Sequence, residues 1–145
     1  MKMQQRGFTL IELVVVITIL GILAAFAVPR FAGLETSARN AAVNGLEGSV
    51  RAASALAHSV ALVTSATSSQ SVLMEGATVT MVNLFPTADN AGITSSLQDT
   101  SGFDTSGNDG TFKLNGAPTP ADCGVIYNAA GGGGIPQISV TTSGC

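Results

Sequence analysis

Apolar residues run almost without interruption from Phe8 to Val28, and Glu12 is the one charged side chain in this run. A helix of these 21 residues is about 31 Å long, which matches the hydrocarbon core of a bilayer. Lys2 and Arg6 precede the run, so the positive-inside tendency places the N-terminus in the cytoplasm and the remainder outside. The pattern therefore predicts a membrane-spanning helix near the N-terminus.

A second helical pattern lies beyond Pro29 and is amphipathic. Its apolar stripe recurs at spacings of three and four residues and consists of Val43, Leu46, Val50, Ala53, Ala57 and Val60. We expect one helix from Phe8 to about Leu62, with Gly21 and Pro29 as its weak points.

The polar positions of the amphipathic half lie mostly off this stripe. They include two Glu–Arg pairs at i,i+4 spacing, 35–39 and 47–51, which predict a solvated face, with subunit contacts as the alternative. The single histidine, His58, is also off the stripe, and we expect it to be exposed.

After Val63 the chain becomes polar and favours strands and turns. Alternation over 78–81 predicts a first strand that ends before Pro86. Asp109-Gly110 predicts a hairpin turn before a strand at 111–114, and further strands are expected at 124–127 and 138–142. The predicted fold class is α+β, in which a long N-terminal helix packs on a small antiparallel sheet.

Composition narrows the functional classes. The chain has 145 residues, a length typical of one domain, and its formal net charge is −3 with no basic stripe, which argues against a nucleic-acid partner. One histidine and dispersed carboxylates offer no nucleophile–base set, so we expect no enzyme and no cofactor. Two cysteines and a distant histidine do not make a metal site.

The two cysteines, Cys123 and Cys145, indicate a disulfide formed in an oxidising compartment, because the N-terminus directs the chain to a membrane. The alternative is a pair of free cytosolic thiols. A disulfide here would enclose a loop of 21 residues, for which chain entropy gives roughly 3 kcal/mol.

Glu12 needs an explanation, because a carboxylate at the bilayer centre costs on the order of 3 kcal/mol unless it finds a partner. One alternative is a Glu that reaches toward the interface. Another is an ordinary secretory signal cut after Ala25-Phe26-Ala27, but its apolar core would exceed the usual length and Pro29 crowds the cut.

The stretch RGFTLIELVVVITILGILAAFAVPRF resembles the class III leader and first helix of type IV pilins and type II secretion pseudopilins. The resemblance implies cleavage between Gly7 and Phe8 by a prepilin peptidase, which also methylates the new Phe8 amine. The mature chain would then hold four basic and nine acidic side chains, a net of −5. In this family, Glu12 of one subunit is expected to pair with the Phe8 amine of its neighbour.

The same resemblance implies three segments and two successive locations for the chain, the inner membrane and a surface filament. Residues 1–7 would be the removed leader, 8–29 the transmembrane and filament-core helix, and 30–145 the periplasmic, later extracellular, domain. The precursor would be a single-pass inner-membrane protein that the pilus assembly machinery converts into a homo-oligomeric helical filament. The segment between Gly21 and Pro29 is expected to lose helicity in the filament.

VNLFPTADNAGI and CGVIYNAAGGGGIPQISVTTSGC resemble the outer domain of pilins of the mannose-sensitive haemagglutinin (MSHA) type, although Phe85 stands where Tyr is more typical. This implies a major pilin of a fibre for surface attachment, with motility as a further role. The alternatives are a type II secretion pseudopilin, which usually lacks the C-terminal disulfide loop, and a minor DNA-binding pilin, which would need a basic or aromatic patch.

Two further motifs are interpreted as structural. Asp99, Asp104 and Asp109 recur five residues apart in DTSGFDTSGNDG, a spacing unlike that of an EF-hand, so polar turns are favoured over calcium binding. The glycines at 131–134 precede Ile135-Pro136 rather than a helix, so they predict a surface loop and not a phosphate cradle.

Overall fold

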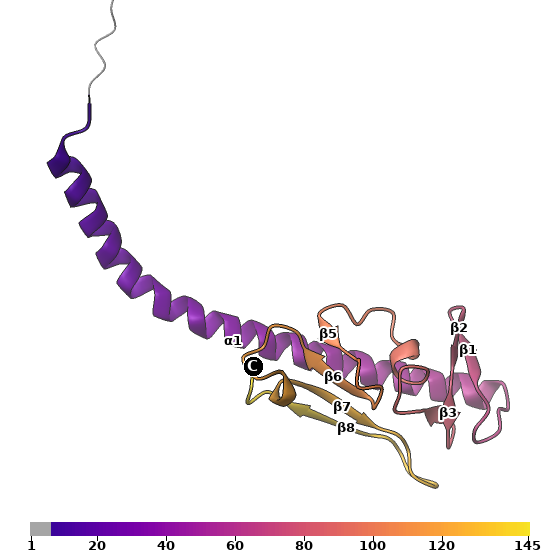
Figure 1. The fold of residues 1–145 in the computed structure, drawn as a ribbon. Helices are drawn as coiled ribbons and strands as arrows, with labels where there is room; N and C mark the ends of the chain where they lie inside the picture. Colours follow the sequence, from indigo (N-terminus) through magenta and orange to yellow (C-terminus); the bar gives the residue numbers. More distant parts are fainter. Residues whose placement is uncertain (1–6) are drawn as a thin grey trace, which may run out of the picture. The chain divides into compact units, whose positions relative to one another are not determined.

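The computed structural model describes residues 7–145. One long helix, α1 (Leu10–Val63), is followed by short strands and two 3-10 turns (Figure 1). The chain divides into two compact units, and the boundary between Ser37 and Ala38 falls inside α1. The expected single helix from the apolar run into the amphipathic half is confirmed, and it continues through Pro29.

The strands form three antiparallel sheets, all in the second unit. The first two sheets are hairpins: β1 (Val72–Met74) with β2 (Ala77–Val79), and β3 (Met81–Val82) with β4 (Phe85–Pro86). The third has the order β5-β6-β7-β8 and comprises β5 (Phe103–Asp104), β6 (Thr111–Leu114), β7 (Gly124–Asn128) and β8 (Gln137–Thr141). The 3-10 turns are η1 (Thr94–Ser96) and η2 (Pro120–Asp122).

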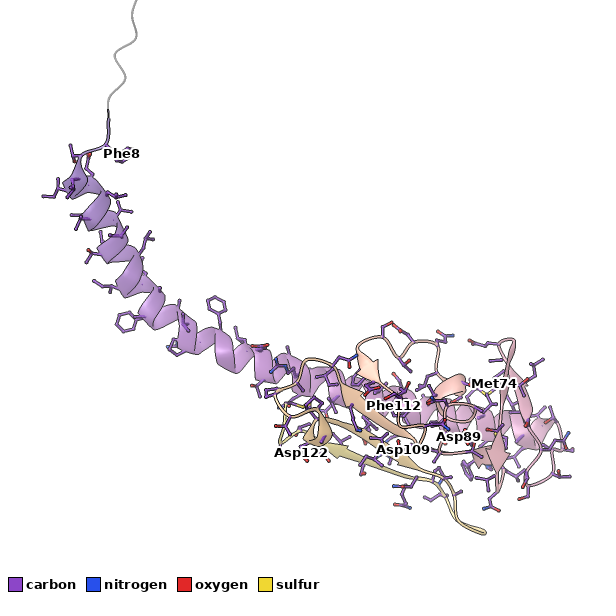
Figure 2. The ribbon with its side chains drawn as sticks, viewed as in Figure 1. Phe8, Met74, Asp89, Asp109, Phe112 and Asp122 are labelled. Atoms are coloured by element: carbon purple, nitrogen blue, oxygen red, sulfur yellow. A yellow bond between two sulfur atoms is a disulfide. The ribbon has the colours of Figure 1, made fainter. Side chains whose placement is uncertain are left out.

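The apolar stripe of α1 is the centre of two hydrophobic clusters. Its first part packs with the four-stranded sheet, where Phe112 lies against the helix (Figure 2); this cluster also contains Val43, Leu46, Val50, Ile93, Val125 and Tyr127. Its last part packs with the two hairpins through Ala57, Ala61, Val72, Met74, Val79 and Met81. The α+β architecture expected from the sequence is therefore confirmed, with Ala61 more deeply buried than the expected Val60.

The helix ends in a Schellman motif. The amide of Ala66 donates to the carbonyl of Ala61 at 2.9 Å, and that of Ser65 donates to Leu62 at 3.2 Å. Ser65 takes a left-handed backbone conformation with φ of 51°. This closes the carbonyl end of the helix and turns the chain into the first hairpin.

The predicted single strand over 78–81 is wrong, because Thr80 separates β2 from β3, which pair with different partners, and its amide donates to the carbonyl of Ala91 at 3.0 Å. Each of the two hairpins closes in a tight turn. Glu75 and Gly76 both have positive φ, as do Asn83 and Leu84, the pattern of two-residue type I′ turns. As a result Pro86 does not follow the strand region but lies inside β4, opposite Met81. The strands expected at 111–114, 124–127 and 138–142 agree with β6, β7 and β8.

The expectation of an exposed His58 is also wrong. Its side chain is half-buried, stacks on Phe85 with ring centroids 4.1 Å apart, and its Nδ1 lies 2.9 Å from the carbonyl of Leu84. Because a carbonyl only accepts, Nδ1 is the donor in this contact. His58 thus supports the second tight turn, where Leu84 holds an unfavourable positive φ of 67°.

Candidate processing and assembly site

The junction between Gly7 and Phe8 lies outside any helix or strand, immediately before α1, and Figure 2 labels Phe8 there. The Phe8 side chain is 89% exposed, and a Cβ added at Gly7 would meet no heavy atom within 4 Å. A peptidase needs an unstructured, accessible peptide bond, and this junction provides one. The basic residues Lys2 and Arg6, and most of the expected 1–7 leader, lie outside the described residues.

Glu12 does not stand alone at the helix start, because it forms a capping box with Thr9. The amide and hydroxyl of Thr9 both donate to Oε2 of Glu12, at 2.8 and 2.7 Å. In return, the amide of Glu12 donates to the hydroxyl oxygen of Thr9 at 3.3 Å. Thr9 is therefore the N-cap and Glu12 the third helical residue, which satisfies free amides of the first turn. Sequence reasoning missed this role of Thr9, although Thr-x-x-Glu before an apolar run is a recognisable signal for it.

The apolar run has no packing partner among the described residues of its own unit. Fourteen large apolar side chains between Phe8 and Val28 are 44–89% exposed. Leaving them in water would cost on the order of 20 kcal/mol or more, at about 1.5–3 kcal/mol for each such side chain. In length and composition the helix is sufficient to cross a membrane. This segment therefore needs lipid or other protein segments around it.

Gly21 and Pro29 both lie inside this helix. Space is open around Gly21, where an added Cβ would meet nothing within 4 Å. Proline removes one helical hydrogen bond, and glycine costs about 1 kcal/mol relative to alanine. Both residues are positioned to weaken the helix between them.

At the other end of the chain, the expected disulfide between Cys123 and Cys145 is present. Both cysteines are buried in the larger hydrophobic cluster. The guanidinium of Arg39 donates to the backbone oxygens of Cys145 and Gly116, at 2.9 and 3.0 Å. The disulfide and Arg39 together tie the end of the chain to helix α1.

A buried hydrogen bond joins the segment around Pro86 to strand β7. The hydroxyl of Tyr127, in β7, donates to the carbonyl of Pro86, in β4, at 2.8 Å. Both residues are fully buried. Burial raises the pKa of Tyr127, and its interaction with the Ser54 side chain opposes that rise.

The aspartate repeat forms three similar turns. Each carboxylate accepts the amide two residues further on: Asp99 from Ser101, Asp104 from Ser106 and Asp109 from Thr111, at 2.7–3.0 Å. These hydrogen bonds lower the pKa of all three aspartates. Such local pairing is the mechanism of Asx turns and accounts for an aspartate at the start of each turn.

Residues 7–145 contain no group of three or more His, Cys, Asp or Glu side chains that could hold a metal ion. On the exposed helix face, Arg51 and Glu47 form an ion pair at 2.6 Å.

Comparison with known proteins points to the N-terminal segment. Residues 2–28 match the family described as the prokaryotic N-terminal methylation motif. The chain is 53% identical over 55 residues to the type IV narrow pilus major component PilA5 of Thermus thermophilus, covering 38% of this chain and 47% of that protein. It is 64% identical over 31 residues to the type IV major fimbrial protein FimA of Dichelobacter nodosus, covering 21% of this chain and 19% of that protein.

These similarities span less than half the length of the curated relatives. No solved structure matches the chain. The family model covers residues 2–28, and the second unit, residues 38–145, which we call the outer unit, is interpreted from its own contacts.

Proposed function

We propose that this protein is a structural subunit of a type IV pilus. One conjunction at the N-terminus carries the proposal: an exposed Gly7–Phe8 junction opens an exposed apolar run, residues 8–28, in which Glu12 is the sole charged side chain. The match to the N-terminal methylation motif, and relatives named as pilus and fimbrial major components, support it.

In this proposal the precursor resides in the inner membrane, with residues 8–29 spanning the bilayer and 30–145 outside. A prepilin peptidase cuts between Gly7 and Phe8 and methylates the new amine. The assembly machinery then extracts the subunit, and segments 8–29 stack in the filament core. Each segment exchanges lipid for protein neighbours, so its apolar side chains stay out of water throughout.

Glu12 sets the stagger between neighbours. Cleavage creates a cationic amine on Phe8, and the carboxylate of Glu12 in the adjacent subunit meets it. A buried ion pair adds little net stability, but a buried charge without a partner is penalised by about 3–5 kcal/mol. A neighbour in the wrong register therefore leaves a charge without a partner. The ion pair between Glu12 and the Phe8 amine thus favours the correct register.

The stretch from Gly21 to Pro29 loses its helical structure in the filament. Its helical backbone is weakened, because it contains the glycine and the proline of the apolar half. Local loss of helicity there lets tightly packed subunits adjust their spacing and lets the fibre extend.

The filament belongs to the MSHA type and serves attachment to surfaces. Support comes from the outer unit, where the disulfide loop and the Pro86 segment are held together through Tyr127. The subunit has no catalytic role in this proposal, and its partners are further copies of itself, the peptidase and the assembly machinery.

The test is the intact mass of the main protein sheared from the cell surface. The proposal expects a chain of residues 8–145 carrying one methyl group and lacking two hydrogens for the disulfide. A surface filament without this chain, or a chain that begins elsewhere, contradicts the proposal. Accumulation of the processed chain in the membrane without any surface fibre would support the secretion pseudopilin instead.

A further inference from the structure

We infer that Thr9 is a positioning residue that holds the Glu12 carboxylate ready for the neighbouring amine; the inference rests on the proposed pilus function. Two of the three hydrogen bonds in the Thr9–Glu12 capping box end on the carboxylate. A single subunit therefore carries this charge already bonded within its own chain before it meets a neighbour.

The two oxygens of the Glu12 carboxylate have different roles. Both donors of Thr9 reach Oε2, from the amide at 2.8 Å and from the hydroxyl at 2.7 Å. An ionised carboxylate has about four acceptor sites on its two oxygens. Oε2 is therefore engaged within the chain, and Oε1 keeps the capacity to accept from a cation outside it.

The cap is compatible with leader removal. Cleavage after Gly7 converts the nitrogen of Phe8 into an amine, but the peptide bond between Phe8 and Thr9 remains. The amide of Thr9 thus stays a hydrogen-bond donor, and the hydroxyl is unaffected. Since all three capping hydrogen bonds join Thr9 and Glu12, the box persists in the mature chain.

This arrangement is favourable both in the membrane and during assembly into the filament. In the membrane, donors from Thr9 reduce the penalty of a carboxylate among apolar groups. At assembly, the side chain of Glu12 is already ordered, so pairing with the neighbour's amine loses less conformational entropy. The neighbour adds to the cap and does not have to displace it.

The role requires a hydroxyl at this position, because that group donates to Oε2 and accepts from the Glu12 amide. Serine has the same group, whereas valine has the shape of threonine without it. The informative pair is therefore Thr9→Ser and Thr9→Val. Thr18 supplies a matched control: its hydroxyl, in the same apolar helix, donates to the carbonyl of Val14 at 2.7 Å and does not reach Glu12.

The first measurement is amide hydrogen exchange at Glu12, by NMR on the full mature chain in phospholipid nanodiscs. Removal of an N-cap side chain should speed exchange by about fivefold in Thr9→Val. Thr9→Ser and Thr18→Val should exchange at Glu12 as the wild type does. Equal exchange in Thr9→Val and the wild type overturns the capping arrangement.

The second measurement is the yield of sheared fibre from cells expressing each variant, normalised to chain whose cleavage is verified by mass. Thr9→Val should give at least about fivefold less fibre than wild type, while Thr9→Ser and Thr18→Val retain it. Normal fibre from Thr9→Val, or loss of fibre that Thr9→Ser does not restore, overturns the positioning role.

The two measurements separate this inference from the proposed function. If the wild type forms no fibre, the pilus proposal fails, and with it the positioning role, whereas the exchange data still decide the cap. If Thr9→Val blocks cleavage, the fibre yield is measured in cells where this variant is exported as a chain that already begins at Phe8. The prepilin peptidase is then not needed.

Discussion

Replacing Tyr127 by phenylalanine tests whether the buried link between the two halves of the outer unit stabilises it. The substitution removes one oxygen and leaves the ring in place. The hydroxyl donates to the carbonyl of Pro86 at 2.8 Å, and both residues are fully buried, so water cannot replace the lost donor. A buried acceptor left without its partner costs about 1–3 kcal/mol.

This cost translates into a measurable change in melting temperature. For a unit the size of residues 38–145, each kcal/mol corresponds to about 4 °C, so Tyr127→Phe should lower Tm by about 4–12 °C. The assay is differential scanning calorimetry of the full mature chain in detergent micelles, with the disulfide intact.

The dependence of Tm on pH is a second measurement of the same hydroxyl. Since burial raises the pKa of Tyr127 above its usual value of 10.0, its contribution is complete below that pH and is lost as the pH rises through the folded-state pKa.

The matched control removes a hydroxyl that is exposed. Ser59 donates to the carbonyl of Ala55 at 2.9 Å on the helix surface, so Ser59→Ala should shift Tm by less than about 2 °C. If Tyr127→Phe melts within about 2 °C of the wild type, or keeps the same alkaline loss of stability, then the buried hydrogen bond does not stabilise the outer unit.

Four further outcomes are expected. Replacing Cys123 and Cys145 together by alanine should lower the free energy of unfolding by roughly 3 kcal/mol, measured by urea titration; a loss below about 1 kcal/mol would argue against loop closure as the source. Gly124→Ala should destabilise strongly, because its Cβ would meet the carbonyl oxygen of Phe112 in the adjacent strand, whereas Gly131→Ala has open space and should melt as the wild type does. The aspartates of the repeat have lowered pKa values, so their contribution is present above the usual value of 3.8 and is lost as the pH falls through the folded-state pKa; asparagine at all three positions keeps the turns and should flatten this acid dependence in titrated melts, and an unchanged slope would refute it. Glu12→Val should insert in the membrane normally but abolish fibre growth, and normal fibres from this variant would rule out a register role for the carboxylate.

Helix α1 could be predicted from the sequence because its two halves each have a simple pattern. A continuous apolar run specifies one half, and spacings of three and four residues specify the other. The strands β6, β7 and β8 also agree with expectation. The disulfide does too, since the chain has two cysteines and an N-terminus that directs it to a membrane.

The hairpins of the outer unit could not be predicted, for a physical reason. Their strands have only two or three residues, too short for alternation to be informative. Their turns depend on positive φ at Glu75 and Leu84, a conformation that residues of these two kinds rarely adopt. The burial of His58 follows from the second hairpin, so it could not be anticipated without that hairpin.

The role of Thr9 is different, because the sequence does contain its signal. The run Thr-Leu-Ile-Glu is a capping box that can be recognised without a structure. The position of Glu12 in an apolar segment favours an explanation of its charge by a contact between subunits. The contact of Glu12 with Thr9 in the same chain is then easily overlooked. Both apply to Glu12, since the cap engages Oε2 and leaves Oε1 for a neighbour.

The most direct measurement of the central claim is a cryo-EM map of the native filament at a resolution that shows side chains. We predict that the Glu12 carboxylate lies within about 4 Å of the Phe8 nitrogen of an adjacent subunit, with Thr9 still bonded to Oε2. A map in which no neighbour's amine approaches Glu12 would contradict this claim.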